Sequence, residues 1–260
     1  MPPESSSALP EAPPLRVFAG TSGWSYPAWK PGFYPAKLSA KKFLSYYASQ
    51  LSSVEVNYTF RKLPSQKQLE GWIAEVAANP AFRFSFKAPQ RITHFRRLVS
   101  CDAQVAELFA ALAPAAHASR LGLILFQLPP NFKADLPRLR AFLSAPAFRA
   151  PAAPRIAFEF RHESWFTEEA ANVLREHNAA LCIAETDDLK TPELHTAVDH
   201  TSFRLRRAGG YPPDEIAAFA HRFRTIAAER DVYVYFKHED EPTGALNAQA
   251  FLRSLAGPTQ

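Results

Sequence analysis

Short runs rich in β-branched and aromatic residues alternate along the chain with longer runs whose apolar positions recur every three to four residues. The short runs predict strands, and the long runs predict helices. The predicted strands are Arg16–Gly20, Ser53–Thr59, Phe82–Lys87, Leu121–Leu128, Arg155–Arg161, Leu181–Glu185, Ser202–Arg206 and Val232–Lys237. The predicted helices are Ala40–Gln50, Gln66–Ala78, Ala103–Ala115, Leu136–Leu143, Glu168–His177, Asp214–Arg230 and Leu246–Leu255.

Strict alternation of strands and helices predicts an α/β fold with a parallel sheet, and eight strands favour closure into a single (β/α)8 barrel of the TIM type. The helix after the sixth strand is missing, because "TDDLKTPELHTAVDH" is only weakly periodic. The barrel domain is expected over residues 15–260. Residues 1–14, "MPPESSSALPEAPP", have the composition of a disordered tail.

Several predicted strands alternate apolar and polar residues, as in "VEVNYT" and "FEFR". Because strand side chains alternate between the two faces, the apolar set should face the helices and the polar set the barrel interior. TIM barrels place their active sites at the carboxyl ends of the strands, so a polar pocket is expected there. The inward set is Glu55, Asn57, Lys87, Gln127, Glu159, Arg161, Arg204, Arg206, Tyr235 and Lys237.

Two loops add side chains to the same end of the barrel. "GTSGWSYPAW", residues 20–29, brings Ser22, Trp24 and Tyr26, which we expect to form a wall over the pocket. "RITHFRR", residues 91–97, adds three arginines and a histidine after the third strand. Trp29 and Trp165 are expected to pack in the core beneath the rim.

Composition narrows the class of protein. The net charge is +5 and the sequence pI is about 9.2, which suits an anionic ligand but does not argue for nucleic acid. No secretory leader or run of about 18 apolar residues occurs, so a cytoplasmic protein without a membrane span is expected. Cys101 and Cys182 lie in apolar segments and are expected to be buried, reduced thiols.

Acidic and basic side chains dominate the expected pocket. Glu55 and Glu159 are the candidate acid/base residues, because a carboxylate beside a buried cation serves as base or anchor and an unpaired one as acid. A glycosidase that carries its carboxylates on strands four and seven is disfavoured, since those strands carry Gln127 and Arg204. Glu185 adds a third carboxylate, and the candidate binding residues are Ser22, Trp24, Tyr26, Asn57, Lys87, Gln127, Arg161, Glu185, Arg204, Tyr235 and Lys237.

Other chemistries have less support. No histidine spacing typical of zinc sites occurs, and the nearby cations disfavour a divalent metal. No G-x-S-x-G elbow is present for nucleophilic catalysis. We therefore expect neither metal nor cofactor.

Six motifs in order, "GTSGWSYPAWKPGFYP", "VEVNYTFRKLP", "FRFSFKAP", "LGLILFQLPPNF", "FEFRHESWF" and "VYVYFKHE…GALNAQAFL", resemble the YecE-like family, domain of unknown function 72. The resemblance covers roughly residues 16–255 and implies a TIM barrel, but no activity. Lys237-His238 stands where many relatives have two asparagines, and Glu185 stands where an aspartate is frequent. Residues that match the family pattern are Gly20, Ser22, Trp24, Glu55, Asn57, Phe60, Lys87, Gln127, Glu159, Arg161, His162 and Asn247.

The sequence favours an enzyme that acts on a small anionic substrate carrying phosphate or carboxylate. Two alternatives stay open: a nucleic-acid-binding protein or phosphodiesterase, and a non-catalytic anion-binding module. The oligomeric state is left open.

Overall fold

Eight parallel strands lie side by side in the order β1-β8-β7-β6-β5-β4-β3-β2 in the computed structural model, which describes residues 16–186, 188–237 and 241–257. The tail expected over residues 1–14 lies outside the described residues. The strands are β1 Val17–Thr21, β2 Ser53–Val56, β3 Arg83–Lys87, β4 Leu121–Gln127, β5 Ile156–Glu159, β6 Ala180–Glu185, β7 His200–Leu205 and β8 Asp231–Phe236.

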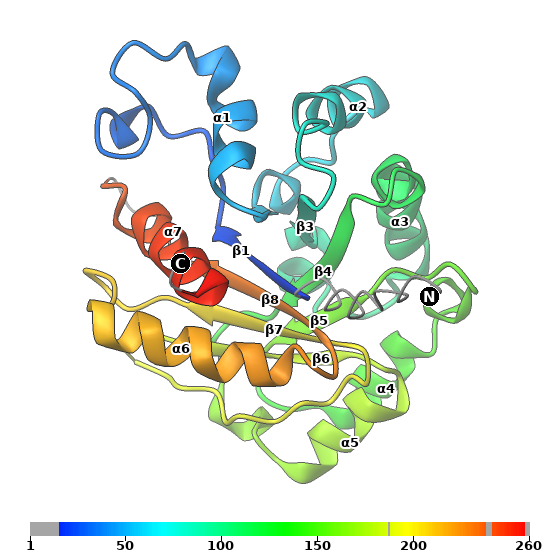
Figure 1. Cartoon of the computed structure of the whole chain (residues 1–260). Helices are drawn as coiled ribbons and strands as arrows, with labels where there is room; N and C mark the ends of the chain where they lie inside the picture. Colours follow the sequence, from blue (N-terminus) through cyan, green and yellow to red (C-terminus); the bar gives the residue numbers. More distant parts are fainter. Residues whose placement is uncertain (1–15, 187, 238–240, 258–260) are drawn as a thin grey trace, which may run out of the picture.

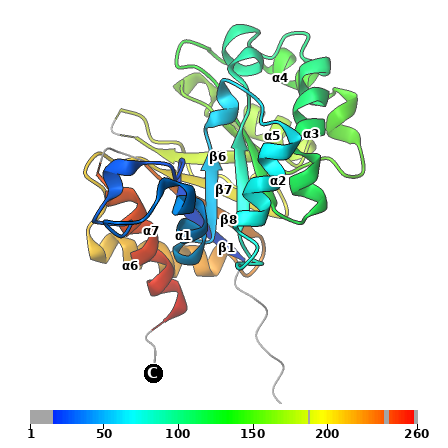
Figure 2. The same cartoon turned by 90° about the horizontal axis from the view of Figure 1, so that it is seen from above.

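Helices surround the strands, with α3, α4 and α5 on one side and α6 and α7 on the other (Figures 1 and 2). The described residues between β6 and β7 form no helix, as the weak periodicity there predicts. None of the described helices is long and apolar enough to cross a membrane. The helices are α1 Phe43–Gln50, α2 Gln66–Glu75, α3 Asp102–His117, α4 Leu136–Leu143, α5 Glu168–Glu176, α6 Pro213–Ile226 and α7 Thr243–Ala256.

The barrel is nearly closed where β1 meets β2. Ser52 N donates a hydrogen bond to Ala19 O at 3.2 Å, and Ser22 and Glu55 form a parallel bridge. A Cβ at Gly20 would lie 1.7 Å from Ser53 O, so only glycine permits this approach of the two strands. The single (β/α)8 barrel expected from the alternation of strands and helices is confirmed.

Some boundaries differ from the prediction because side chains redirect the backbone. β2 ends at Val56 rather than Thr59, and Tyr58–Phe60 forms a 3-10 turn. The Thr59 hydroxyl donates to Val56 O at 2.9 Å and Lys87 O at 2.6 Å, which holds this turn against the end of β3. The basic loop after β3 contains a π-helical turn, Arg91–Phe95.

The two faces of the strands carry different side chains. The face toward the helices is a continuous apolar core that includes Val54, Phe86 and Phe158. A second apolar cluster fills the barrel interior and includes Leu125 and Tyr235. Cys101 and Cys182 are both buried and free, as expected.

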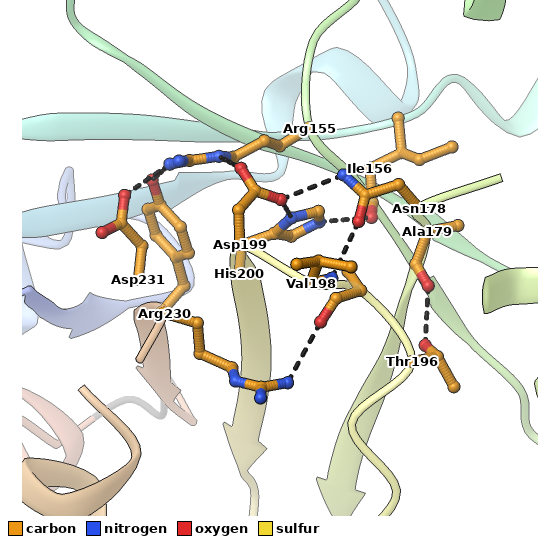
Figure 3. Close-up of polar contacts among 12 residues, drawn as sticks. Arg155, Ile156, Asn178, Ala179, Thr196, Val198, Asp199, His200, Arg230 and Asp231 are labelled. Atoms are coloured by element: carbon orange, nitrogen blue, oxygen red, sulfur yellow. Dashed lines mark hydrogen bonds and ion pairs between the residues drawn. The ribbon is translucent and has the colours of Figure 1, made fainter. Parts of the chain in front are cut away.

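Charged groups close the amino-terminal end of the barrel (Figure 3). The Arg155 guanidinium lies between the carboxylates of Asp231 and Asp199, with its Nε 2.7 Å from Asp199 Oδ2. His200 is fully buried, with Nδ1 2.9 Å from Asp199 Oδ1 and Nε2 2.9 Å from Ile156 O. These contacts join the starts of β5, β7 and β8 and leave the opposite end of the barrel to the candidate site.

Candidate functional site

Arg204 on β7 lies in the upper barrel interior and is only 2% exposed. Its Nη2 lies 2.7 Å from Oε1 of Glu55 on β2. Its Nη1 donates a hydrogen bond to Oε2 of Glu159 on β5. The inward direction expected of the two carboxylates is therefore confirmed, and Arg204 links them through the barrel interior.

A second hydrogen-bond donor supports each carboxylate. Ser22 Oγ donates to Glu55 Oε1 at 2.8 Å, and Gln127 Nε2 lies 2.9 Å from both oxygens of Glu159. Burial alone would raise the pKa of Glu159, but Arg204 and Gln127 outweigh it and hold the pKa below its usual value. Glu159 is therefore ionised at neutral pH, so it can accept a proton or anchor a cation but cannot serve as a proton donor.

Lys87, the last residue of β3, differs from Glu159 because its pKa is shifted toward neutral pH. Burial, together with the neighbouring Arg204, lowers the pKa of its ammonium group to about 8. Glu55 and Glu159 oppose that shift without cancelling it. Its Nζ lies 4.2 Å from the centre of the Phe60 ring, in the arrangement of a cation–π contact. Lys87 therefore gains or loses its proton close to neutral pH.

Two more arginines lie close to the two carboxylates and their hydrogen-bond partners. Arg206 Nη1 lies 3.4 Å from Ser22 Oγ, and burial followed by the charge of Arg204 lowers the pKa of the Arg206 guanidinium. Arg161 Nε lies 3.9 Å from Glu159 Oε1, and its side chain is 45% exposed. Sequence analysis placed Arg206 in the inward set, among the cations suited to a phosphate or carboxylate. We call Ser22, Glu55, Gln127, Glu159, Arg204 and Arg206 the Arg204 cluster.

The charges of the described residues around the cluster do not balance. Among these residues, four basic side chains, including the half-exposed Arg161, face two carboxylates, an excess of two positive charges when Lys87 is protonated. The described residues contain no group of three or more His, Cys, Asp and Glu side chains that could hold a metal ion. The arrangement is suited to an anion, because guanidinium and ammonium groups donate hydrogen bonds to phosphate and carboxylate oxygens.

The first loop lines a cavity of about 330 Å³ beside the cluster. Trp24 and Tyr26 form part of its wall, together with Tyr58 and Trp72. Asn57 also lines it, and its buried Oδ1 has no hydrogen-bond partner among the described residues. Sequence analysis missed Tyr58 and Trp72. Trp72 lies in a predicted amphipathic helix, where an aromatic residue is expected to pack in the hydrophobic core.

Tyr235 lies deeper than a ligand-binding residue would. It points into the barrel as expected but is fully buried, and its hydroxyl contacts Ser53 Oγ at 2.8 Å and Ser85 Oγ at 2.6 Å. The next inward-facing position toward the carboxyl end of β8 is Lys237, two residues further along the chain. Alternation predicts which face of the sheet a residue occupies, but not how far it lies from the mouth of the barrel. Tyr235 is therefore part of the floor beneath the cluster rather than a lining residue.

Glu185 also differs from its expected place. On β6, Cys182 belongs to the apolar cluster inside the barrel. Glu185 lies three residues later, so alternation places its side chain on the opposite face of the strand. Glu185 Oε1 instead pairs with Arg207 Nη2 at 2.8 Å, outside the Arg204 cluster. Lys237 follows β8 and is half-buried. His238 lies outside the described residues.

Trp29 and Trp165 are buried, as expected for core residues. His94, in the basic loop, packs against Phe60 with ring centres 4.9 Å apart. Burial and the neighbouring Lys87 lower the pKa of the His94 imidazole. The rim of the barrel on this side is thus built from Phe60, Lys87 and His94.

A family model described as "Protein of unknown function DUF72" matches residues 18–260. The chain belongs to the DUF72 family. Among curated proteins, this DUF72 chain is 31% identical over 156 residues to the UPF0759 protein YunF of Bacillus subtilis (strain 168), covering 58% of the chain. It is 31% identical over 153 residues to YecE of Escherichia coli (strain K12), covering 58% of the chain. The matches span 52% and 51% of the lengths of these relatives, about half.

Solved structures agree with the fold of the DUF72 chain. A DUF72 family protein from Thermotoga maritima MSB8 is similar, with a TM-score of 0.77 and 24% identity, covering 92% of this chain and 99% of that one. A DUF72 family protein from Enterococcus faecalis V583 gives a TM-score of 0.76 at 19% identity, covering 94% and 97%. A D-psicose 3-epimerase from Clostridium cellulolyticum H10 gives 0.57 at 10% identity, covering 92% and 98%, a likeness of fold alone.

Proposed function

We propose that this DUF72 protein is an enzyme that binds a small substrate carrying phosphate or carboxylate at the mouth of the barrel. The observation that carries the proposal is the Arg204 cluster with Lys87 beside it. Buried charges are costly unless they are paired or contact a ligand, and among the described residues here positive charge exceeds negative charge. A half-buried lysine whose pKa is lowered toward neutrality is typical of a functional site.

Each charged group has a distinct role in this proposal. Arg206 and Arg161 bind the anion, because their guanidinium groups offer paired N–H donors near the cluster. Arg204 is held by both carboxylates and forms a fixed positive floor. Glu55 or Glu159 accepts a proton, and Lys87 exchanges one close to neutral pH.

Thermal unfolding with and without inorganic phosphate tests the anion site. Bound phosphate stabilises the folded state, so Tm should rise with phosphate concentration in the wild type. Arg206→Ala should abolish that rise. Arg253→Ala, which removes an exposed arginine from α7, is the matched control and should respond like the wild type. No phosphate effect in the wild type, or an equal effect in Arg206→Ala, would refute the proposed anion site.

One observation favours the nucleic-acid alternative as a second candidate. Phe95 is 73% exposed, and it lies in the basic loop with Arg91, Arg96 and Arg97. Exposed aromatic rings among arginines stack on the bases of single strands. Binding of an oligonucleotide that weakens steeply with salt and is lost in Phe95→Ala would support this candidate. Anion binding without turnover would instead indicate a non-catalytic module.

A further inference from the structure

The cavity beside the Arg204 cluster has walls made largely of aromatic rings. Trp24 and Tyr26 come from the loop after β1, Tyr58 follows β2, and Trp72 lies on α2. The volume of about 330 Å³ is at the lower end of ligand pockets, which span about 300–1,000 Å³. The cavity opens to solvent on one side, so a ligand can enter it.

The rings are arranged at right angles. The Trp24 and Trp72 ring centres lie 5.3 Å apart at an interplanar angle of 85°, and Tyr58 and Trp72 lie 6.2 Å apart at 88°. A flat ring stacked on one wall would therefore present its edge to another. Offset stacking and edge-to-face contact are the two arrangements that aromatic rings favour. Tyr58 is 44% exposed, which leaves part of its ring open to a ligand.

Tyr26 links the wall of the cavity to the Arg204 cluster. The Tyr26 hydroxyl donates a hydrogen bond to Ser22 O at 2.9 Å, and the Ser22 side chain contacts Glu55 and Arg206. Burial and the nearby Glu55 raise the pKa of Tyr26 to about 12, so its hydroxyl stays protonated. Asn57 follows β2, two residues after Glu55, and also lines the cavity.

We propose that this cavity binds a flat heteroaromatic ring of the molecule whose anionic group binds at Arg206. The inference rests on the proposed anion site and narrows its substrate to ring-bearing anions of the nucleoside monophosphate class. The aromatic walls hold the ring, and Asn57 in the same wall lies at its edge.

Calorimetric titration with three probes tests the ring site: inorganic phosphate, ribose 5-phosphate and adenosine 5′-monophosphate. The nucleotide should bind at least tenfold more tightly than ribose 5-phosphate or phosphate, since stacking of a base on an aromatic ring contributes about tenfold or more. Tyr58→Ala should remove most of that advantage and leave phosphate binding unchanged. Leu246→Ala, which truncates an apolar residue of similar exposure on α7, is the matched control and should change neither affinity.

The outcomes separate the two proposals. Equal affinities for nucleotide and phosphate would overturn the ring site and leave the anion site standing. Tight binding of ribose 5-phosphate that depends on Tyr58 would place a sugar in the cavity and also overturn it. If phosphate fails to bind, uncharged adenosine tests the ring site alone. Quenching of tryptophan fluorescence by adenosine that Tyr58→Ala abolishes would support the ring site, and no quenching would refute it.

Discussion

The guanidinium of Arg204 on β7 lies 2.7 Å from the carboxylate of Glu55 on β2, and both side chains are almost fully buried. The same guanidinium also binds Glu159 on β5. One cation thus links three strands of the barrel and pairs with two carboxylates at its upper end. The consequences for stability and for ligand binding can be measured separately.

Replacing Arg204 should strongly destabilise the fold. Arg204→Met leaves Glu55 and Glu159 buried without their cation, and loss of one partner from a buried ion pair costs about 3–5 kcal/mol. Urea unfolding measures the loss. Arg161→Met, which removes a half-exposed arginine 3.9 Å from the same glutamate, should change stability by less than about 1 kcal/mol. Equal effects of the two substitutions would show that the buried link does not contribute to stability.

Gly20 should not tolerate a side chain. In Gly20→Ala the new Cβ would lie 1.7 Å from Ser53 O, so β1 and β2 must separate, at a cost of about 3 kcal/mol or more. Gly71→Ala is the control, because nothing lies within 4 Å of a Cβ at that helical position. It should stabilise the protein by about 1 kcal/mol, since alanine is the better helix former. Thermal unfolding distinguishes the two, and a stable Gly20→Ala protein would contradict the tight seam.

The amino-terminal end of the barrel should govern stability in acid. Hydrogen bonds from His200, Asn178 and Arg155 hold the pKa of Asp199 well below its usual value, against the effect of burial. A depressed carboxyl pKa contributes stability above the ordinary value of about 4 and loses it as the pH falls further. The free energy of unfolding should therefore drop below about pH 4 in the wild type and change less in Asp199→Asn. The exposed Asp188→Asn control should keep the wild-type profile, and an unchanged profile in Asp199→Asn would contradict this role.

Alternation along the strands predicted the direction of the central charges correctly. Glu55, Glu159 and Arg204 each occupy a polar position between apolar neighbours, so the face is set by sequence alone. The distance of a residue from the strand end is set by register between strands. For that reason Tyr235 lies two residues too far from the mouth of the barrel to line the site. Glu185 ends a strand whose small inward residues, such as Cys182, leave it on the opposite face.

The aromatic cavity was only half predictable. Trp24 and Tyr26 follow a strand and two small residues, and this position predicts a loop at the mouth. Trp72 reaches the cavity from a helix that is distant in sequence, through packing that no local pattern encodes. The lowered pKa of Lys87 likewise depends on burial and on Arg204, a residue of another strand.

Titration of Lys87 with and without inorganic phosphate tests the anion site most directly. Carbon-13-labelled lysine reports the charge state by NMR, and the Lys87→Arg variant identifies the signal. We expect a pKa of about 8 without phosphate, and a higher pKa with phosphate, because a bound anion favours the protonated ammonium. Arg206→Ala should remove the phosphate effect. A pKa near the ordinary 10.5 in the free protein, or one that phosphate leaves unchanged, would contradict an anion site at this end of the barrel.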